Sequence, residues 1–551
     1  MKKKFLFIAL IAGIPFIYSQ EFSRKDSLQG GFSFERTSFD VQRYDLNIKV
    51  NLEEKSIAGY NDITFKIVEP TSSIQIDLFE NMKVDSIVFE GKKLNYKRDF
   101  GAVFIEFKEP QVAGGSDKKL RFYYSGNPVL AKNAPWDGGF VFKKDAGGKE
   151  WAGVAVQGTG ASLWYPVKDS QSDEPELGAS IKAAVPNGLM DVSNGRLMGS
   201  EDLKNGYTRW DWEVKNPINT YNITLNIGDY VHIHDSHQGL DLDYYVLRGN
   251  EEKAKKHFEE VKPMMDCFQS KFGKYPFADD GYKLVETPYL GMEHQSAVAY
   301  GNKYRKGYLG IDNTGTGIGL LFDYIIIHET GHEWFGNSIT SRDIADMWIH
   351  ESFTTYAESI FVECLYGYEK AQAYLRGQKR AVANDRPIIG HYEVNNEGSS
   401  DMYYKGAQLL NTLRHVVNDD AKWWKILLNY AEAYRHKIID TQTVIAYFNS
   451  AAGIDLTALF NQYLNYRNIP ELEVGFEKKT VKFRWKTDVQ NFKMPVILFH
   501  GNRETRLQAS NEWSYYKISG KEKETAKFDD LKFFIKVSYM QPLPNDHTTI
   551  N

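Results

Sequence analysis

The first part of the chain alternates apolar and polar residues, which is the period of a half-buried β-strand. Clear runs of this kind, separated by turn residues, are YDLNIKVNL (44–52), SIQIDLF (73–79), VFIEFKE (103–109), KLRFYYSG (119–126) and YNITLNIGDYVHI (221–233). Each run would bury one face and leave the other in water. The pattern predicts a large antiparallel β domain over residues 20–234, with 221–233 as its last strand.

Helical periodicity replaces alternation in the middle of the chain. The segment 250–273 has acidic residues near its start and Gly273 at its end, which are the usual signals for the two ends of a helix. Further helical patterns lie in 319–336, 346–367, 405–418 and 455–466. Asp440 and Asp455 are the expected N-caps of the last two helices. We therefore expect a mostly helical domain over residues 235–469.

Alternation returns in the last part of the chain. The short runs ELEVGFE, TVKFRWK, MPVILFH and FFIKVSY follow residue 470 and are typical of a small β-sandwich. The predicted fold class is therefore multidomain α+β: an N-terminal antiparallel β domain, a mostly helical domain, and a C-terminal β-sandwich over residues 470–551.

The extreme N-terminus has the layout of a secretory signal peptide. Lys2 to Lys4 are positive, Phe5 to Tyr18 form an apolar run, and Ser19 offers a small residue for cleavage near positions 19–20. An uncleaved N-terminal anchor is the alternative, but the run is short for a membrane span. No later stretch is long and apolar enough to cross a bilayer. The expectation is export to the periplasm or the exterior.

Charge and cysteine content exclude some classes of protein. A net charge of −5 over 551 residues gives no support for a nucleic-acid partner. With only Cys267 and Cys364, a disulfide-stapled scaffold is excluded, although a single bridge is open. Both cysteines lie in apolar, helical-looking segments, so we expect buried free thiols.

The segment HETGH carries the first candidate chemistry. His328 and His332 are four residues apart in a helical run, so their side chains share one face and can grip one zinc ion. Glu329 would lie beside the open coordination position, where a carboxylate can take a proton from a zinc-bound water. A chance match on a buried helix is the alternative; unpaired His and Glu in such an apolar run would carry a burial penalty.

A third ligand is available downstream. Glu351 follows His332 after eighteen residues, between Trp348 and Phe353 on the next predicted helix. A turn and part of that helix can return its carboxylate to the metal, which leaves one coordination position for water. The alternative for Glu351 alone is a solvated helix residue. The sequence thus predicts one zinc ion per chain, held by His328, His332 and Glu351.

The segments HETGHEWFGNSIT and WIHESFTTYAE together resemble the zinc aminopeptidase family typified by aminopeptidase N and leukotriene hydrolase, which are gluzincin metallopeptidases. That family follows H-E-x-x-H with W-F-G-N and then a W-L-N-E-G-F-A segment containing the glutamate ligand. Here Ile349, His350 and Ser352 depart from the last segment, while Glu351 is retained. The resemblance implies a thermolysin-like catalytic domain and aminopeptidase activity on peptides with a free N-terminus.

A second family motif is G-x-M-E-N, whose glutamate binds the free amino group of the substrate. The chain has YLGMEHQSAVAY, so Glu293 matches that glutamate. Leu290 and His294 replace the flanking Gly and Asn. By this resemblance Gly291, Met292, Glu293 and His294 form a substrate-binding segment.

Two further residues match the family by motif. Tyr403 in MYYKGAQLL falls where the family places a tyrosine that stabilises the oxyanion, and Gln157 in VAVQGTGASLWYP falls where a Glu or Gln assists amine binding. For Tyr403 the alternative is a core aromatic residue next to Tyr404. The resemblance therefore implies Glu329 and Tyr403 as catalytic groups.

Longer family members add a C-terminal helical domain that narrows the entrance to the site, and we expect no matching domain after the predicted β-sandwich of this chain. The site would then be more open, or covered by the partner in a homo-oligomer. A thermolysin-like zinc endopeptidase and an inactive peptide-binding protein on the same scaffold remain as alternatives. Nothing in these residues requires the epoxide hydrolysis of leukotriene hydrolase.

Overall fold

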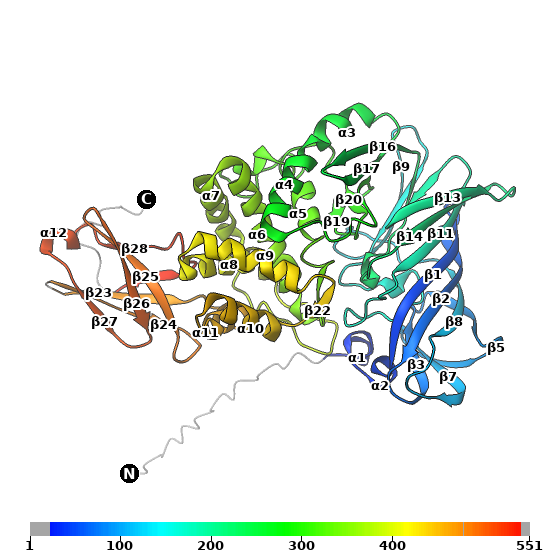
Figure 1. Ribbon diagram of the computed structural model, residues 1–551, viewed down its shortest axis with the longest axis horizontal. Helices are drawn as coiled ribbons and strands as arrows, with labels where there is room; N and C mark the ends of the chain where they lie inside the picture. The colour runs from blue at the N-terminus through cyan, green and yellow to red at the C-terminus, as the bar shows by residue number, and fades with distance from the viewer. Residues whose placement is uncertain (1–21, 478, 541–551) are drawn as a thin grey trace, which may run out of the picture.

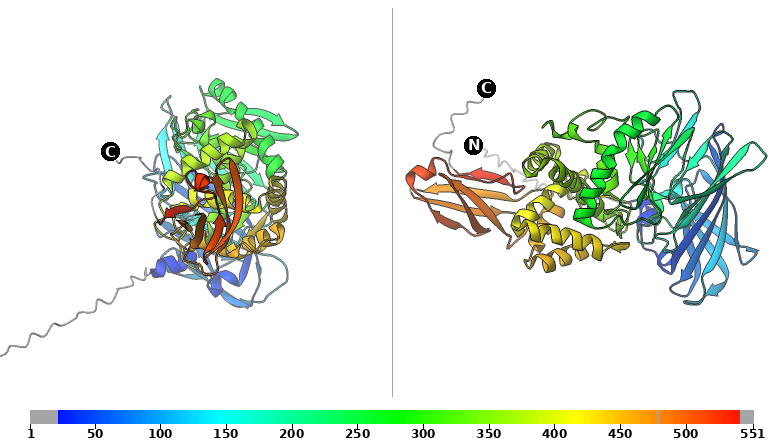
Figure 2. Two further views of the ribbon diagram at one scale, coloured as in Figure 1. Left: turned by 90° about the vertical axis from the view of Figure 1, so that its left-hand side faces the viewer. Right: turned by 45° about the horizontal axis from the view of Figure 1, so that its top comes forward.

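The computed structural model describes residues 22–477 and 479–540, so the predicted signal peptide lies outside the described residues. Along the long axis, Figure 1 shows a β-rich body, a block of helices and a small β-sandwich. The right-hand view in Figure 2 shows the same order, and the left-hand view looks along this axis from the β-sandwich. The predicted succession of β, α and β regions is confirmed. Among the described residues, no helix is long and apolar enough to cross a membrane.

The N-terminal domain is built on an eight-stranded sheet with strand order β13-β14-β11-β1-β2-β8-β4-β5. The bounds are β1 Phe39–Asn51, β2 Ser56–Ile67, β3 Thr71–Asp77, β4 Met82–Phe89, β5 Lys92–Lys93, β6 Asn95–Asp99, β7 Ala102–Gln111, β8 Lys118–Gly126, β9 Gly139–Lys144, β10 Glu150–Ala155, β11 Ala179–Pro186, β12 Met190–Val192, β13 Arg196–Asp202, β14 Tyr207–Val214 and β15 Asn226–Gly228. The sheet is not wholly antiparallel as predicted, because β1 pairs with β11 in parallel. Two short helices, α1 (Arg24–Gly30) and α2 (Phe34–Thr37), precede it.

The predicted strand 221–233 is divided between two sheets. Its middle forms β15, which pairs with β10 and β12 in the N-terminal domain. Its end opens β16 (Tyr230–His237), which pairs with β17 (Leu240–Leu247). Together with β18 (Tyr282–Glu286), β20 (Val298–Tyr300) and β19 (Gly291–Met292), these two strands form the five-stranded sheet of the second domain. The change from one sheet to the other at Asp229 could not be predicted from the sequence, because apolar and polar residues alternate with the same two-residue period in both strands.

Helices make up the rest of this second domain. Their bounds are α3 Glu251–His257, α4 Val261–Phe272, α5 Tyr324–Gly331, α6 Trp348–Tyr366, α7 Tyr368–Gln378, α8 Tyr404–Val417, α9 Asp420–Ala433, α10 Thr441–Ala452 and α11 Thr457–Leu464, with the strand pair β21 (Ile339–Ser341) and β22 (Lys437–Ile439). Gly273 ends α4 with a φ of 86°, and Asp440 caps α10 by accepting from the Thr443 amide. Asp455 lies one residue too early, because Leu456 occupies the N-cap of α11.

The C-terminal domain is the expected β-sandwich. One sheet has the order β27-β24-β23-β29 and the other β26-β25-β28. The bounds are β23 Glu471–Glu477, β24 Thr480–Lys486, β25 Lys493–His500, β26 Arg503–Ser510, β27 Ser514–Lys517, α12 Gly520–Lys523, β28 Lys527–Phe528 and β29 Lys536–Tyr539. Its buried side chains belong to the same apolar cluster as those of the helical domain, so these two domains share one core. The N-terminal domain has its own core.

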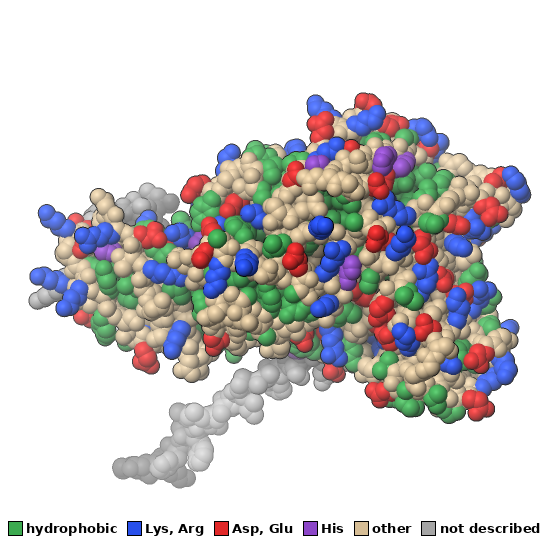
Figure 3. Space-filling model, in the orientation of Figure 1, with side chains coloured by type: hydrophobic (Ala, Val, Ile, Leu, Met, Phe, Trp, Pro, Cys, Tyr) green, Lys and Arg blue, Asp and Glu red, His purple; other side chains and the backbone are tan. Residues whose placement is uncertain are grey.

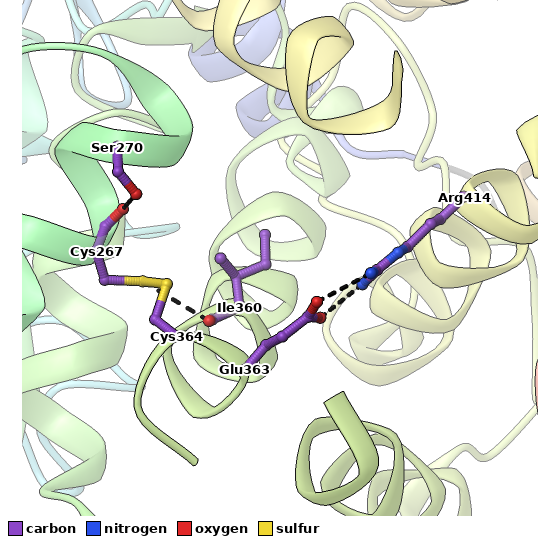
Figure 4. The surroundings of a disulfide bond; sticks show 6 residues. All are labelled: Cys267, Ser270, Ile360, Glu363, Cys364 and Arg414. Carbon is purple, nitrogen blue, oxygen red and sulfur yellow. Dashed lines mark hydrogen bonds and ion pairs between the residues drawn. A yellow bond between two sulfur atoms is a disulfide. The ribbon is translucent and has the colours of Figure 1, made fainter. Parts of the chain in front are cut away.

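The two cysteines form a disulfide, and the expectation of free thiols was wrong. Cys267 on α4 is joined to Cys364 on α6 across 97 residues of chain. Figure 4 shows the bond between the two helices, close to the ion pair of Glu363 with Arg414. Both sequence segments do lie in apolar helices, as predicted. The helices pack against each other, and local sequence patterns do not contain that information.

Breaking this bridge is expected to destabilise the fold. A cross-link that closes a loop of roughly 100 residues removes up to about 4.7 kcal/mol of unfolded-chain entropy, and typical bridges contribute about 2–4 kcal/mol. We expect Cys364→Ala to lower the free energy of unfolding by about that amount, measured by denaturant titration. A reductant should lower the midpoint of the parent protein and leave that of Cys364→Ala unchanged; equal midpoints for the parent with and without reductant would contradict the prediction.

Candidate active site

Helix α5 places the two predicted histidine ligands. Asp323 caps the helix by accepting from the amides of Ile325 and Ile326. His328 lies in its last turn and His332 immediately follows it, with ring centroids 5.0 Å apart. Both imidazoles are buried. The helical spacing predicted from HETGH is therefore the spacing that the structure has.

Helix α6 brings the third ligand to the same point. Glu351 Oε2 lies 3.4 Å from His332 Nε2 and 3.7 Å from His328 Nε2. This buried carboxylate oxygen has no hydrogen-bond partner among the described residues. A buried carboxylate oxygen left without a donor is costly, whereas two imidazole nitrogens and one carboxylate around a common point match zinc. The three residues form a buried zinc-binding site.

A second layer of contacts orients the two imidazoles. His328 Nδ1 lies 2.8 Å from Glu358 Oε1, and His332 Nδ1 lies 2.9 Å from the carbonyl oxygen of Phe335. These bonds direct each Nε2 toward the metal position. Glu358 also accepts from Tyr374 and Gln378. Glu358 was not predicted, although it lies seven residues after Glu351 on the same face of α6, and this spacing is the signal that could have revealed it.

The Glu329 side chain packs close to the backbone of Gly291. A Cβ atom on Gly291 would come within 2.7 Å of Glu329 Oε1 and 2.8 Å of Ile325 Cγ2. Gly291 on β19 therefore allows the strand to approach α5 closely. Burial raises the pKa of Glu329 to about 7, which is close to the value that suits a general base at neutral pH.

Glu293 is held by residues from the other domain. Its Oε1 accepts from Gln157 Nε2 at 2.6 Å and from the Tyr221 hydroxyl at 3.2 Å. Gln157 Nε2 also lies 3.1 Å from Glu351 Oε1. The structure thus brings the predicted pair Glu293 and Gln157 together beside the zinc ligands. Tyr221 was missed, because the sequence places it in a strand-like run with no chemical motif.

His294 does not belong to the substrate-binding segment as predicted. Its side chain is fully buried and absent from the lining of the cavity, which Gly291, Met292 and Glu293 do reach. Burial lowers the pKa of His294 to about 3, so the ring is neutral. The chain leaves β19 after Met292, and the His294 side chain lies in the protein interior.

Tyr403 lies directly before α8, with its ring 6.2 Å from that of His328. Burial, reinforced by the carboxylates of Glu351 and Glu293, holds the pKa of its hydroxyl well above the usual value, so it stays protonated and can donate. The preceding carbonyl, that of Met402, accepts from Ser352 Oγ at 2.6 Å. Ser352 stands where the family motif has Gly, and its hydrogen bond joins the segment before Tyr403 to α6, the helix that contains Glu351.

One cavity of about 630 Å³ lies between the two larger domains, and it is lined by the three zinc ligands together with Glu329, Glu293, Gln157 and Tyr403. Its wall also includes Trp136, Thr159, Arg386, Asn395 and Glu397. The N-terminal segment supports this wall from outside: Gln29 Nε2 donates to the Thr159 carbonyl at 2.6 Å, and the Asn395 amide donates to the Asp26 carbonyl at 3.2 Å. The cavity is large enough for a few amino-acid residues and polar enough to bind charged groups.

The family model "Peptidase M1 N-terminal domain" matches residues 41–222, and "Peptidase family M1 domain" matches residues 256–463. Together these two matches span well over half of the chain.

Relatives with curated descriptions share low identity with this chain. It is 21% identical over 499 residues to "Probable aminopeptidase 1" of Sulfurisphaera tokodaii, covering 85% of this chain and 59% of that protein. It is 25% identical over 427 residues to "Aminopeptidase N" of Lactobacillus helveticus, covering 70% of this chain and 46% of the relative. The chain thus spans about half of the length of such relatives.

A solved structure has a similar fold. It is a variant of an M1 zinc metallopeptidase from Deinococcus radiodurans bound to a Tyr-Ser-Ala substrate, with 21% identity and a TM-score of 0.64, covering 79% of this chain and 96% of the other. Both domain matches, together with the buried site of two histidines and one glutamate, place this chain in peptidase family M1.

Proposed function

We propose that this protein is a zinc-dependent aminopeptidase that removes residues from peptides with a free N-terminus. The observation that carries the proposal is Glu293, a buried carboxylate held by Gln157 and Tyr221 on the cavity wall beside the zinc ligands. A carboxylate there would pair with a protonated α-amine. The anchor would place the first peptide bond, and no later one, at the metal. The names of the relatives support this proposal.

The chain's own groups have distinct roles in this reaction. When bound, zinc supplies an activated water and polarises the carbonyl. Glu329 accepts a proton from the water as its oxygen bonds to the carbonyl carbon, and gives that proton to the amine nitrogen when the C–N bond breaks. Tyr403 donates a hydrogen bond to the negative oxygen that forms. Glu293 holds the substrate amine throughout.

Two alternatives fit the same scaffold less well. A thermolysin-like endopeptidase shares the zinc ligands and Glu329, but has no use for an amine anchor beside the metal, so Glu293 speaks against it. An inactive peptide-binding protein would not need the carboxylate of Glu329 and the hydroxyl of Tyr403 in the same cavity as the zinc ligands.

N-acetylation of the substrate distinguishes an aminopeptidase from an endopeptidase. We expect a good peptide substrate to be hydrolysed from its N-terminus and its N-acetylated form to be resistant, because acetylation removes the positive charge that Glu293 binds. The measurement is product release followed by mass spectrometry, with a C-terminally amidated peptide as the matched control. Efficient cleavage of the acetylated peptide at an internal bond would favour the endopeptidase.

We further propose that the protein is exported and cleaved near residues 19–20. The support is the layout of Lys2–Lys4 followed by the apolar run Phe5–Tyr18, together with a disulfide, since disulfides persist mainly in oxidising compartments. N-terminal sequencing of protein recovered outside the cytoplasm is expected to begin near Gln20. A mature protein that still begins at Met1 would contradict cleavage.

A further inference from the structure

A second group of metal-ligating side chains lies on the hairpin β16–β17, apart from the active site. His232 and His234 are on β16, and Asp243 is on β17. Their ligand atoms lie within 4.8 Å of one another. Figure 3 shows histidine side chains beside acidic ones over this hairpin, on the surface of the molecule. None of these residues lines the catalytic cavity, so the proposed peptidase activity does not account for them.

Strand geometry places the three side chains on one face. His232 and His234 are two residues apart, so they point to the same side of the sheet. Asp243 is the direct cross-strand partner of His234, and His232 lies diagonally across from it. His232 Nε2 is 2.7 Å and His234 Nδ1 is 3.0 Å from one and the same oxygen, Asp243 Oδ1. Ligand atoms that share a tetrahedral zinc ion at about 2.0–2.2 Å lie roughly 3.4 Å from each other, so the imidazoles need to shift outward only slightly to admit an ion.

The group is partly fixed in place before any ion binds. The His232 ring stacks on Tyr245 with centroids 4.6 Å apart and planes 8° apart. The Asp243 side chain is 15% exposed, whereas the two histidine side chains are 42% and 59% exposed. The carboxylate is therefore anchored, and the imidazoles leave the remaining coordination positions open to water. Two imidazoles and one carboxylate are borderline donors that suit Zn²⁺, Ni²⁺ or Cu²⁺ better than Mg²⁺ or Ca²⁺.

Neither Arg196 nor Lys283, the two nearby basic residues, pairs with Asp243 Oδ1. Arg196 Nη1 pairs with Asp241 at 2.7 Å and is 3.9 Å from the other oxygen of Asp243. Lys283, the parallel-strand neighbour of Asp243, donates to the Gly195 carbonyl, and burial lowers its pKa to about 7. Asp243 Oδ1 is thus left to the two histidines.

We propose that His232, His234 and Asp243 form a second site for a divalent transition metal, which fastens strand β16 to β17. β16 is an edge strand, with β17 as its one neighbour in the sheet. An unpaired edge is a weak point of a sheet. A metal held by two side chains of β16 and one of β17 adds a cross-link there, and the binding energy stabilises the folded hairpin. The site is structural and does not depend on the peptidase function.

Zinc titration of the protein already loaded with its catalytic zinc tests the proposal. Isothermal calorimetry and metal analysis after gel filtration are expected to show one further equivalent of zinc per chain. His232→Asn and His234→Asn should each weaken that second equivalent by about tenfold or more, and the double variant should remove it. Hydrogen exchange at the β16 amides should slow when zinc is added to the parent protein and stay unchanged in the double variant.

His237→Asn is the matched control. His237 lies on the same strand and pairs with Asp266 at 2.6 Å, outside the group, so its loss should leave the second equivalent intact. Unchanged peptide hydrolysis and thermal midpoint in the absence of added zinc would show that the double variant is folded. The proposal is overturned if the parent protein takes up no second equivalent, or if that equivalent survives in the double variant.

Discussion

Glu329→Gln is expected to reduce kcat for a free-amine peptide by about 10²–10⁴-fold, the usual contribution of a general acid–base group. The amide has the shape of the carboxylate but cannot accept the proton of the attacking water. The space beside Gly291, which a Cβ atom would fill, accommodates this substitution, since no heavy atom is added. The zinc content should remain at one per chain, because Glu329 is not among the three ligands.

Measuring the zinc content together with steady-state kinetics distinguishes a general-base role of Glu329 from a role in holding the metal. Glu358→Gln is the informative counterpart, because Glu358 orients His328 and removing such a contact typically weakens metal affinity about 10–100-fold. Glu329→Gln should therefore lose turnover with zinc retained, whereas activity of Glu358→Gln should recover when zinc is added. A Glu329→Gln protein with near-normal kcat would remove the general-base assignment.

Glu293→Ala is expected to raise KM for free-amine peptides sharply, with a loss in kcat/KM of about 10²-fold. Removing one partner of a buried, hydrogen-bonded charge pair costs about 2–5 kcal/mol. Glu293→Gln should lose most of the same affinity for the substrate amine, because its side chain carries no negative charge. Its amide can still hydrogen-bond to Gln157 and Tyr221.

The comparison of the two variants separates charge from packing. If Glu293→Gln kept a normal KM, the hydrogen bonds and not the charge would position the amine. If Glu293→Ala left KM unchanged as well, Glu293 would have no role in substrate binding, and the endopeptidase alternative would gain support. Zinc content serves as the control for an intact site, since Glu293 lies outside the ligand set.

Local periodicity was sufficient to predict the strands and helices that bury one face. Alternation revealed most of the long strands, such as β1 and β8, because each buries one face. The helices α5 and α6 followed from apolar periodicity, and the ligands on them from spacing. The division of 221–233 between two sheets, the parallel pairing of β1 with β11 and the five-stranded sheet around β18 did not follow, because pairing partners are chosen by distant residues.

The sequence by itself determined that His328 and His332 share one helix face, since an i, i+4 pair on a helix does so regardless of the surrounding fold. Glu351 was predicted from its spacing, but its approach to the histidines depends on the packing of α6 against α5. Only the tertiary structure decided the surroundings of the zinc ligands and the contacts elsewhere in the molecule. It brought Gln157 and Tyr221 from the β domain onto Glu293, turned His294 away from the cavity, joined Cys267 to Cys364, and set His232 and His234 against Asp243. Each of these depends on two segments distant in the chain packing together, and packing is governed by the whole core rather than by local periodicity.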